Sequence, residues 1–221
     1  MRRLVVSDIH GAYKALLDVL EKAKFEPKED LLIGIGDYVD GYSQTYEVIE
    51  YLRKLPNFKG VIGNHDALYL EWANEPVIPP QPIWTKQGGE ATLKSYDYKV
   101  NEVHRAWLAA LPYYIELDNM LFIHGGYDPT LPIAKQSKWN VTWDRDLIYD
   151  SLQNFEHPEI KYDKVFVGHT ALKKLWIGNK VIDIDTGAGW QGVLTLMDID
   201  ILDYWQSETT GILYPDEQRI Q

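Results

Sequence analysis

Short apolar runs that end in polar clusters recur three times in the first third of the chain. The runs and the clusters that follow them are residues 4–6 and 7–11, 31–35 and 36–40, and 60–62 and 63–66. Apolar residues at helical spacing lie between the runs, namely Leu16, Val19, Leu20 and Ala23, then Val48, Ile49 and Leu52 after Ser43 as the expected N-cap. This order of strand, helix and strand predicts parallel strands whose polar ends meet at one edge of a sheet.

The middle of the chain differs in character because prolines interrupt it. These prolines are Pro76, Pro79, Pro80 and Pro82. They predict an extended connection, and two helices are expected after it, near residues 90–96 and 101–110. We interpret residues 76–111 as a helical insertion beside the site. Trp72 and Trp84 lie near this insertion and are candidates for shaping a cleft.

The second half of the chain has a strand-like pattern. Apolar and aromatic runs are found at residues 114–117, 120–123, 165–167, 176–177, 181–184 and 193–197. Asp118-Asn119 and Gly178-Asn179 separate neighbouring runs and are typical of hairpin turns. We therefore expect a single α/β domain over residues 1–221, built as a two-sheet α/β/β/α sandwich with helices on the outer faces.

Composition narrows the function classes. The 221 residues are 45% hydrophobic, which suits one compact core, and the net charge of −11 argues against nucleic acid as a partner. There is no cysteine, so a metal would have to be held by oxygen and nitrogen atoms. The first apolar run is too short for a signal peptide or a membrane span, which predicts a cytoplasmic protein with no membrane partner.

Polar residues at the strand ends are of the types that bind divalent metals. Five of them follow apolar runs directly or within a few residues: Asp8, Asp37, Asn64, His124 and His169. Taken alone, Asp8 and His10 are ambiguous, because such a pair also caps loops. Together, the carboxylates, imidazoles and amide oxygen form a donor set for two hard or borderline dications if one carboxylate bridges them. Two metals about 3.5–4 Å apart catalyse in-line displacement at phosphorus.

The order and spacing of these blocks resemble the calcineurin-like metallophosphoesterases, in particular the phosphoprotein phosphatase branch with its compact bacterial and bacteriophage-lambda-type serine/threonine phosphatases. The blocks are Asp8-Ile9-His10-Gly11, Gly36-Asp37-Tyr38-Val39-Asp40, Gly63-Asn64-His65-Asp66, His124-Gly125-Gly126 and Gly168-His169-Thr170, with a closing segment Ile184-Asp185-Thr186-Gly187-Ala188. The similarity extends from Asp8 to about Met197.

The resemblance implies two divalent metal ions, with manganese expected first and iron, zinc or cobalt as alternatives. Carried over block by block, it implies that Asp8 and His10 hold the first metal, Asp37 bridges, and Asn64, His124 and His169 hold the second. His65 is then left to protonate the leaving group. Asp40 would orient His65 and favour its charged form. The alternative for Asp40 is a loop carboxylate that caps a backbone amide.

The chain departs from the family pattern at one position. The family continues the second block with an arginine that binds the substrate phosphate, whereas Gly41 and Tyr42 stand here. Arg145, in Trp143-Asp144-Arg145, resembles the other phosphate-binding arginine of the family and is the expected phosphate ligand. Lys86 lies in the insertion and is a second candidate, although a solvated surface lysine is the more common case.

These observations predict a metal-dependent phosphomonoesterase that uses a bridging hydroxide on a two-metal centre. The resemblance implies a serine/threonine protein phosphatase, whose partner would be a phosphorylated protein or a small phosphate ester. Two alternatives remain. One is a dinucleoside polyphosphate hydrolase, which uses the same metal core in a sister branch. The other is a catalytically weak phosphoprotein-binding module that keeps the fold and has lost activity through Gly41.

Overall fold

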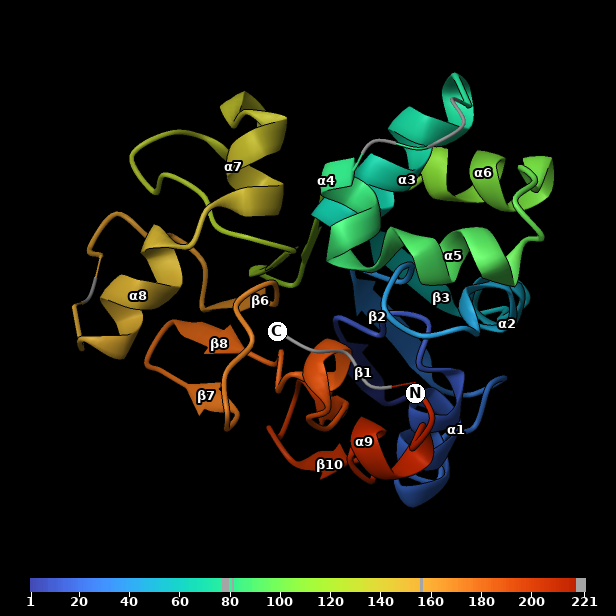
Figure 1. Ribbon diagram of the computed structural model, residues 1–221. Coiled ribbons are helices and arrows are strands. Elements are labelled where there is room, and N and C mark those ends of the chain that lie inside the picture. Colours follow the sequence, from blue (N-terminus) through green and yellow to red (C-terminus); the bar gives the residue numbers. More distant parts are fainter. Residues whose placement is uncertain (77–79, 81, 156, 218–221) are drawn as a thin grey trace.

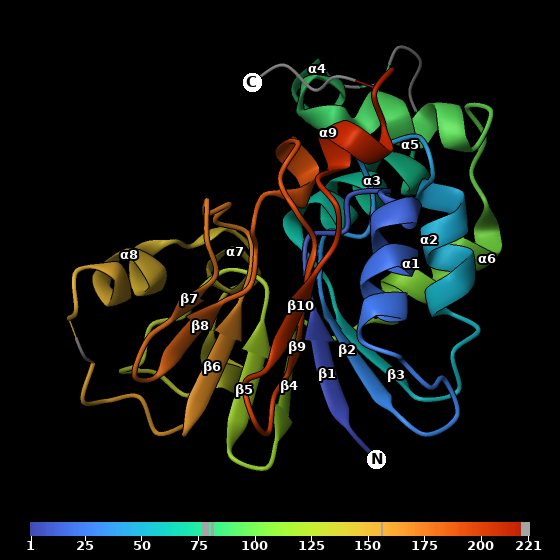
Figure 2. The ribbon, with the colours of Figure 1, turned by 90° about the horizontal axis from the view of Figure 1, so that it is seen from below.

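The computed structural model describes residues 1–76, 80, 82–155 and 157–217. Within these residues, two five-stranded sheets pack face to face and helices cover their outer faces (Figures 1 and 2). This arrangement confirms the predicted two-sheet α/β sandwich. Of the four prolines expected to break the middle of the chain, Pro79 lies outside the described residues.

The first sheet carries the three predicted parallel strands. Its order is β10–β9–β1–β2–β3. The strands are β1 (Arg3–Val6), β2 (Leu31–Ile35), β3 (Phe58–Val61), β9 (Thr195–Asp198) and β10 (Tyr204–Gln206). β1 pairs in parallel with β2 and β2 with β3, whereas β9 pairs antiparallel with β1. The parallel strands therefore bring three polar clusters to one edge of the sheet.

The second sheet has the order β4–β5–β6–β8–β7. The strands are β4 (Tyr114–Leu117), β5 (Met120–Ile123), β6 (Lys164–Val167), β7 (Trp176–Ile177) and β8 (Val181–Asp183). β4 and β5 form the predicted hairpin, and both turn residues, Asp118 and Asn119, have positive φ as a tight two-residue turn requires. β5, β6 and β8 are parallel, so their carboxyl ends also share one edge.

Helices form three groups around the sheets. The outer face of the first sheet is covered by α1 (Tyr13–Lys22), α2 (Thr45–Leu52) and α6 (Glu102–Ala109). The second sheet is covered by η2 (Ile133–Lys135), α7 (Lys138–Trp143) and α8 (Asp146–Leu152). At the carboxyl ends of the parallel strands lie α3 (Asn64–Asn74), α4 (Pro82–Trp84), η1 (Thr85–Gly89), α5 (Glu90–Ser95), η3 (Ala188–Trp190) and α9 (Thr210–Leu213) (Figure 2).

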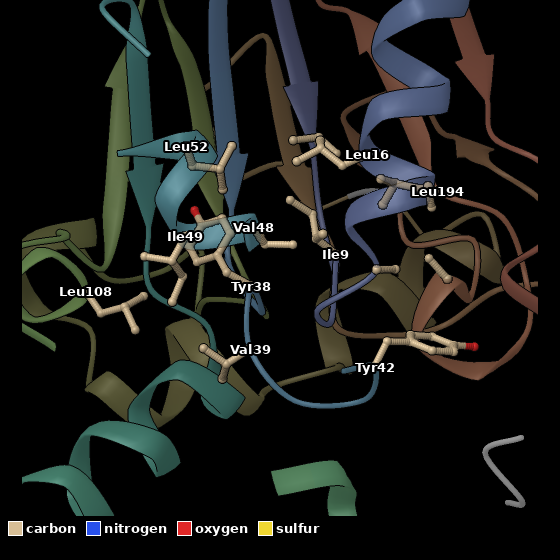
Figure 3. Packing of buried hydrophobic residues seen from close by; sticks show 14 of the residues in the cluster. Ile9, Leu16, Tyr38, Val39, Tyr42, Val48, Ile49, Leu52, Leu108 and Leu194 are labelled. Carbon is tan, nitrogen blue, oxygen red and sulfur yellow. The ribbon is translucent and has the colours of Figure 1, made fainter. Parts of the chain in front are cut away.

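The core has three layers because strand side chains alternate between faces. In β1, Leu4 and Val6 pack toward the helices, and Figure 3 shows the cluster to which they belong. Val5 points the other way and packs between the sheets with Phe122 and Phe166. Both sheets are thus covered on both faces, so their edges near the polar clusters are held rigidly.

One helix start differs from the expectation. α2 begins at Thr45 with Gln44 as its N-cap, so the prediction of Ser43 as the N-cap was wrong. Instead, the hydroxyl of Ser43 donates to Glu217 at 2.7 Å and ties the loop before α2 to the C-terminal segment. A membrane-spanning helix is not found anywhere in the part of the chain that the structure describes.

Candidate metal centre

The predicted site residues of both sheets meet where the two sets of strand ends face each other. The backbone N–H of His169, after β6, donates to Oδ2 of Asp8, after β1, at 3.1 Å. Nε2 of His124, after β5, lies 2.9 Å from Oδ1 of Asn64 and 3.2 Å from Oδ2 of Asp37. The structure therefore brings together side chains that are spread over most of the sequence.

Asp37 is at the centre of this group. Its Oδ2 lies 3.7 Å from Nε2 of His10 and 3.2 Å from Nε2 of His124, and its Oδ1 accepts the backbone N–H of His65 at 2.9 Å. Nε2 of His10 also lies 3.8 Å from Oδ1 of Asp8. Donor atoms on either side of Asp37 thus surround one carboxylate, as a bridging ligand requires.

Each of the three candidate histidine ligands has one ring nitrogen bound to a backbone carbonyl. Nδ1 of His10 donates to Val39 at 3.2 Å and Nδ1 of His124 to Ile35 at 2.9 Å. In His169 the roles are reversed, since Nε2 donates to the carbonyl of Trp143 at 3.1 Å. Such bonds fix the ring and leave the other nitrogen for a metal, which is the usual second layer of a metal site.

Among the residues that the structure describes, two groups of three each bring one donor atom per residue within 4.8 Å of one another. These groups are His10, Asp37 and His65, and Asp37, His124 and His169. Both groups are buried and both contain Asp37. The first includes His65, which the resemblance leaves free of metal. Nδ1 of His65 is hydrogen-bonded to Oδ2 of Asp40 at 2.7 Å.

The loops that carry these residues are strained and interlocked. Positive φ angles occur at Asp8 (53°), His10 (51°), Asp37 (55°), Asp40 (70°) and His169 (67°). Non-glycine residues seldom adopt this conformation, and its cost of about 1–3 kcal/mol each is typical of functional sites. The loop after β1 is bound to the loop after β2, because the N–H groups of Asp8 and His10 donate to the carbonyls of Gly36 and Asp37.

Asp66 holds the second and third loops together, a role that sequence reasoning did not assign to it. Its carboxylate accepts backbone N–H groups of Asp37 at 2.8 Å, Tyr38 at 3.0 Å and Gly63 at 2.9 Å. Gly63 is required beside it, since a Cβ there would overlap Oδ1 of Asp37. The quoted block contained Asp66, but only the fold shows which amides it reaches.

The charges of the site call for a cation. Burial and the neighbouring charge of Asp37 raise the pKa of Asp8 to about 6, even though His124 acts in the opposite direction. Burial also acts to raise the pKa of Asp37, but His124, His65 and His10 outweigh it and hold that pKa below its ordinary value. The carboxylates of Asp8 and Asp37 share a small buried volume. Divalent cations would neutralise them, so the residues present fit a metal centre.

Five of the six donor residues line a cavity of about 230 Å³, and the sixth, His124, is fully buried behind them. The cavity wall is formed by Asp8, His10, Asp37, Asn64, His65, Gln87, Trp143, Arg145, His169, Asp185 and Trp190. Arg145, the predicted phosphate ligand, lies on this wall, and its guanidinium is 3.5 Å from the carbonyl of His169. Asp185 was missed, although it follows the apolar run of β8 in the same way as the other polar residues follow their runs.

Lys86 lies beside the cavity rather than on its wall. It lines a neighbouring cleft of about 260 Å³ together with Gly41 and Trp190, and its side chain is exposed. Gln87, the next residue, reaches the cavity instead. Trp190 lines both spaces, so the two are adjacent.

Gly41 is built into its loop. Its φ is 87°, and its N–H donates to the carbonyl of Gly88 in η1 at 3.1 Å. Tyr42 is buried; its hydroxyl donates to Thr210 at 2.9 Å and its ring packs on Tyr214 with 4.6 Å between centroids. The loop that departs from the family pattern is therefore fixed from two sides, by the segment that carries η1 and by the C-terminal segment.

Comparison with known proteins agrees with this geometry. Residues 1–201 match the family described as calcineurin-like phosphoesterase. The chain belongs to this family. It is therefore a hydrolase of phosphate esters, and the family uses divalent metals. The resemblance drawn from the sequence blocks is confirmed.

Relatives with two different names are similar to the chain. Serine/threonine-protein phosphatase 2 of Salmonella typhimurium is 33% identical over 208 residues, which cover 88% of this chain and 91% of that protein. A symmetrical bis(5'-nucleosyl)-tetraphosphatase of Buchnera aphidicola is 35% identical over 79 residues, or 34% of this chain and 28% of that protein. Among solved structures, a putative diadenosine tetraphosphatase has a TM-score of 0.72 at 23% identity, covering 93% of this chain and 92% of that one, which shows the shared fold.

Proposed function

We propose that this chain is a two-metal phosphomonoesterase that acts on phosphoserine and phosphothreonine in proteins. The observation that carries the proposal is the arrangement of donors on both sides of Asp37, with His10 and His124 each within 3.7 Å of its carboxylate. The similarity to a serine/threonine-protein phosphatase, over 88% of this chain at 33% identity, supports the choice of substrate, whereas the tetraphosphatase relatives match between 34% and 64% of the chain.

In this proposal the six donors divide between two cations. Asp8 and His10 would hold the first, Asp37 would bridge, and Asn64, His124 and His169 would hold the second. Divalent cations bound there would polarise phosphate oxygens and lower the pKa of a water molecule that serves as nucleophile. Oxygen and nitrogen ligands suit manganese, which we expect first, and also iron, zinc or cobalt.

The remaining roles fall to residues of the chain that bind no metal. His65 would donate a proton from Nε2 to the leaving alkoxide, since its Nδ1 is held by Asp40. Arg145, on the cavity wall, would bind the phosphate oxygens through its guanidinium. Asp185 is a third carboxylate on the wall, and we assign it no role in the reaction.

Hydrolysis of dinucleoside polyphosphates is the second candidate. The tetraphosphatase relative and the neighbouring structure favour it, and the adjoining cleft beside Trp190 offers space next to the metal cavity. A weak phosphoprotein-binding module is the third, and the complete donor set with His65 and Asp40 argues against it.

A matrix of metals and substrates tests these candidates. Protein purified without chelator is assayed with manganese, iron, zinc and cobalt against a phosphoserine peptide, p-nitrophenyl phosphate and diadenosine tetraphosphate. We expect metal-dependent turnover, with the phosphopeptide preferred over the dinucleotide. A higher kcat/KM for the dinucleotide would favour the second candidate. No turnover of any of these substrates with any metal would favour the third.

A further inference from the structure

The carboxylate of Asp40 is enclosed by three side-chain donors. Oδ2 accepts from Nδ1 of His65 at 2.7 Å and from Nε1 of Trp84 at 2.9 Å, and Oδ1 accepts from the hydroxyl of Thr92 at 2.8 Å. Asp40 is fully buried, as is Thr92, and Trp84 is 2% exposed. A buried carboxylate with this set of donors has one orientation that satisfies all of them.

Thr92 holds both the backbone and the side chain of Asp40. Its hydroxyl oxygen accepts the backbone N–H of Asp40 at 2.7 Å while its hydroxyl proton goes to Oδ1. Asp40 has a φ of 70°, a strained value that a non-glycine residue keeps only when its surroundings impose it. The two-sided contact with Thr92 imposes this conformation.

Both extra donors come from the segment between β3 and β4 that sequence analysis treated as an insertion. Trp84 ends α4 and Thr92 lies in α5. The indole of Trp84 packs against Trp72, with 5.5 Å between centroids, and a Cβ on Gly89 would overlap it. The segment is thus packed to aim one N–H at Asp40.

We infer that Trp84 and Thr92 are positioning residues for proton transfer by His65. The inference rests on the proposed function, in which Nε2 of His65 protonates the leaving alkoxide. A histidine ring whose Nδ1 is bound to a fixed carboxylate has its Nε2 direction fixed as well. If Asp40 could rotate, His65 would spend part of its time turned away from the leaving oxygen, and turnover would fall in proportion.

Four variants separate this role from simple packing. Trp84→Phe keeps an aromatic ring and removes the N–H, and Thr92→Val keeps the shape and removes the hydroxyl. Thr92→Ser retains the hydroxyl and is the conservative control. Trp107→Phe is the matched tryptophan control. Trp107 lies in α6, within the same insertion, and packs on Tyr38 and Phe58. Metal content and thermal melting are measured for each.

The readout is the dependence of kcat on the leaving group. An alkoxide needs protonation more than p-nitrophenolate does, so Trp84→Phe and Thr92→Val are expected to lower kcat on a phosphoserine peptide about tenfold, less than the 10²–10⁴ of a whole general acid. On p-nitrophenyl phosphate the loss should be less than about threefold. Thr92→Ser and Trp107→Phe should stay near wild type, with both metals retained in all four.

A double variant completes the test. If Trp84 acts through His65, then His65→Asn with Trp84→Phe should be no slower than His65→Asn alone. Additive losses, equal losses on both substrates, or loss of metal would overturn the inference, as would wild-type kcat in both donor variants. If Trp84→Phe does not fold, the comparison of Thr92→Val with Thr92→Ser tests the inference by itself. Failure of the proposed function is distinct, since the wild type would then not hydrolyse the phosphopeptide, or His65→Asn would show no dependence on the leaving group.

Discussion

The backbone N–H of His169 donates to Oδ2 of Asp8 at 3.1 Å, across 161 positions of sequence. Asp8 follows β1, the central strand of the first sheet, and His169 follows β6, the central strand of the second. In the proposed function Asp8 binds the first metal and His169 binds the second. This contact therefore fixes the positions of the two metal sites relative to each other. Substitutions in either half should therefore be judged by metal content as well as by rate.

Asp37→Asn is expected to damage the centre more than Asp8→Asn. Asp37 has donors of both proposed metals within 3.7 Å, whereas Asp8 serves one, so we expect a kcat about tenfold lower for Asp37→Asn and loss of more than one metal per chain. Metal analysis and turnover of the two purified proteins provide the measurement. Equal losses with both metals retained would contradict a bridging role.

His65→Asn should keep both metals and lower turnover by about 10²–10⁴. The reduction should be larger for phosphoserine than for p-nitrophenyl phosphate, because p-nitrophenolate leaves without full protonation. Steady-state kinetics on both substrates, with metal content as the control, give the ratio. A ratio that does not change with the leaving group would assign His65 another role, such as a metal ligand beside His10 and Asp37.

Arg145→Ala is expected to lower kcat/KM by about 10²–10³, since Arg145 lies on the cavity wall and would lose its contact with the phosphate. Lys86→Ala should change kcat/KM on p-nitrophenyl phosphate less than about threefold, because Lys86 lines the neighbouring cleft. The two variants serve as controls for each other. The reverse order of effects would make Lys86 the phosphate ligand.

Gly41→Arg should destabilise the protein instead of restoring the family pattern. The φ of 87° at Gly41 is a left-handed conformation that costs an arginine about 1–2 kcal/mol, and the Gly41 N–H is bound to Gly88. Gly41→Ala carries the same backbone cost without the new charge and is the matched control. Thermal melting should show both variants lowered alike. A Gly41→Arg protein with unchanged melting and higher activity would show that the loop accommodates the side chain.

Glu50 should contribute to the acid stability of the fold. Glu50 lies in α2, and its carboxylate binds Arg53 and Lys54, just beyond the end of that helix, and His104 in α6; these contacts lower its pKa from 4.5 to about 2. A carboxyl with a lowered folded-state pKa stabilises the fold above pH 4.5 and loses that contribution as the pH falls toward 2. Melting curves of Glu50→Gln should therefore lie below wild type at pH 7 and approach it near pH 3. A constant difference would contradict the assignment.

Much of the fold could be predicted because strand ends and hydrophobic spacing are local features. The runs before Asp8, Asp37 and His169 are strands, and their polar ends meet as parallel pairing requires. β10, α8 and α9 were not expected, since they are short and lack a clear period. Ser43 was the wrong N-cap because its hydroxyl binds Glu217, a partner that no local pattern indicates.

The candidate site was predictable in its residue types and less so in its supports. Asp40 and His65, which the resemblance names together, are hydrogen-bonded at 2.7 Å, while their roles stay predictions. Trp84 in α4 and Thr92 in α5 hold the carboxylate of Asp40. They lie 44 and 52 residues away in the sequence, and the direction of their donor groups depends on packing. The sequence could not show whether Lys86 or Gln87 faces the cavity, because the backbone conformation of η1 decides this.

The position of β9 beside β1 has a consequence for synthesis on the ribosome. β1 (Arg3–Val6) is translated well before the turn with Trp190 and its antiparallel neighbour β9 (Thr195–Asp198). Asp8, His10 and Asp37 can therefore approach one another early, but the nascent chain keeps an open sheet edge until β9 has been made. A chain that stalls or ends before residue 195 would expose that edge and become a substrate for chaperones or proteases. The active protein would therefore form only in one late step.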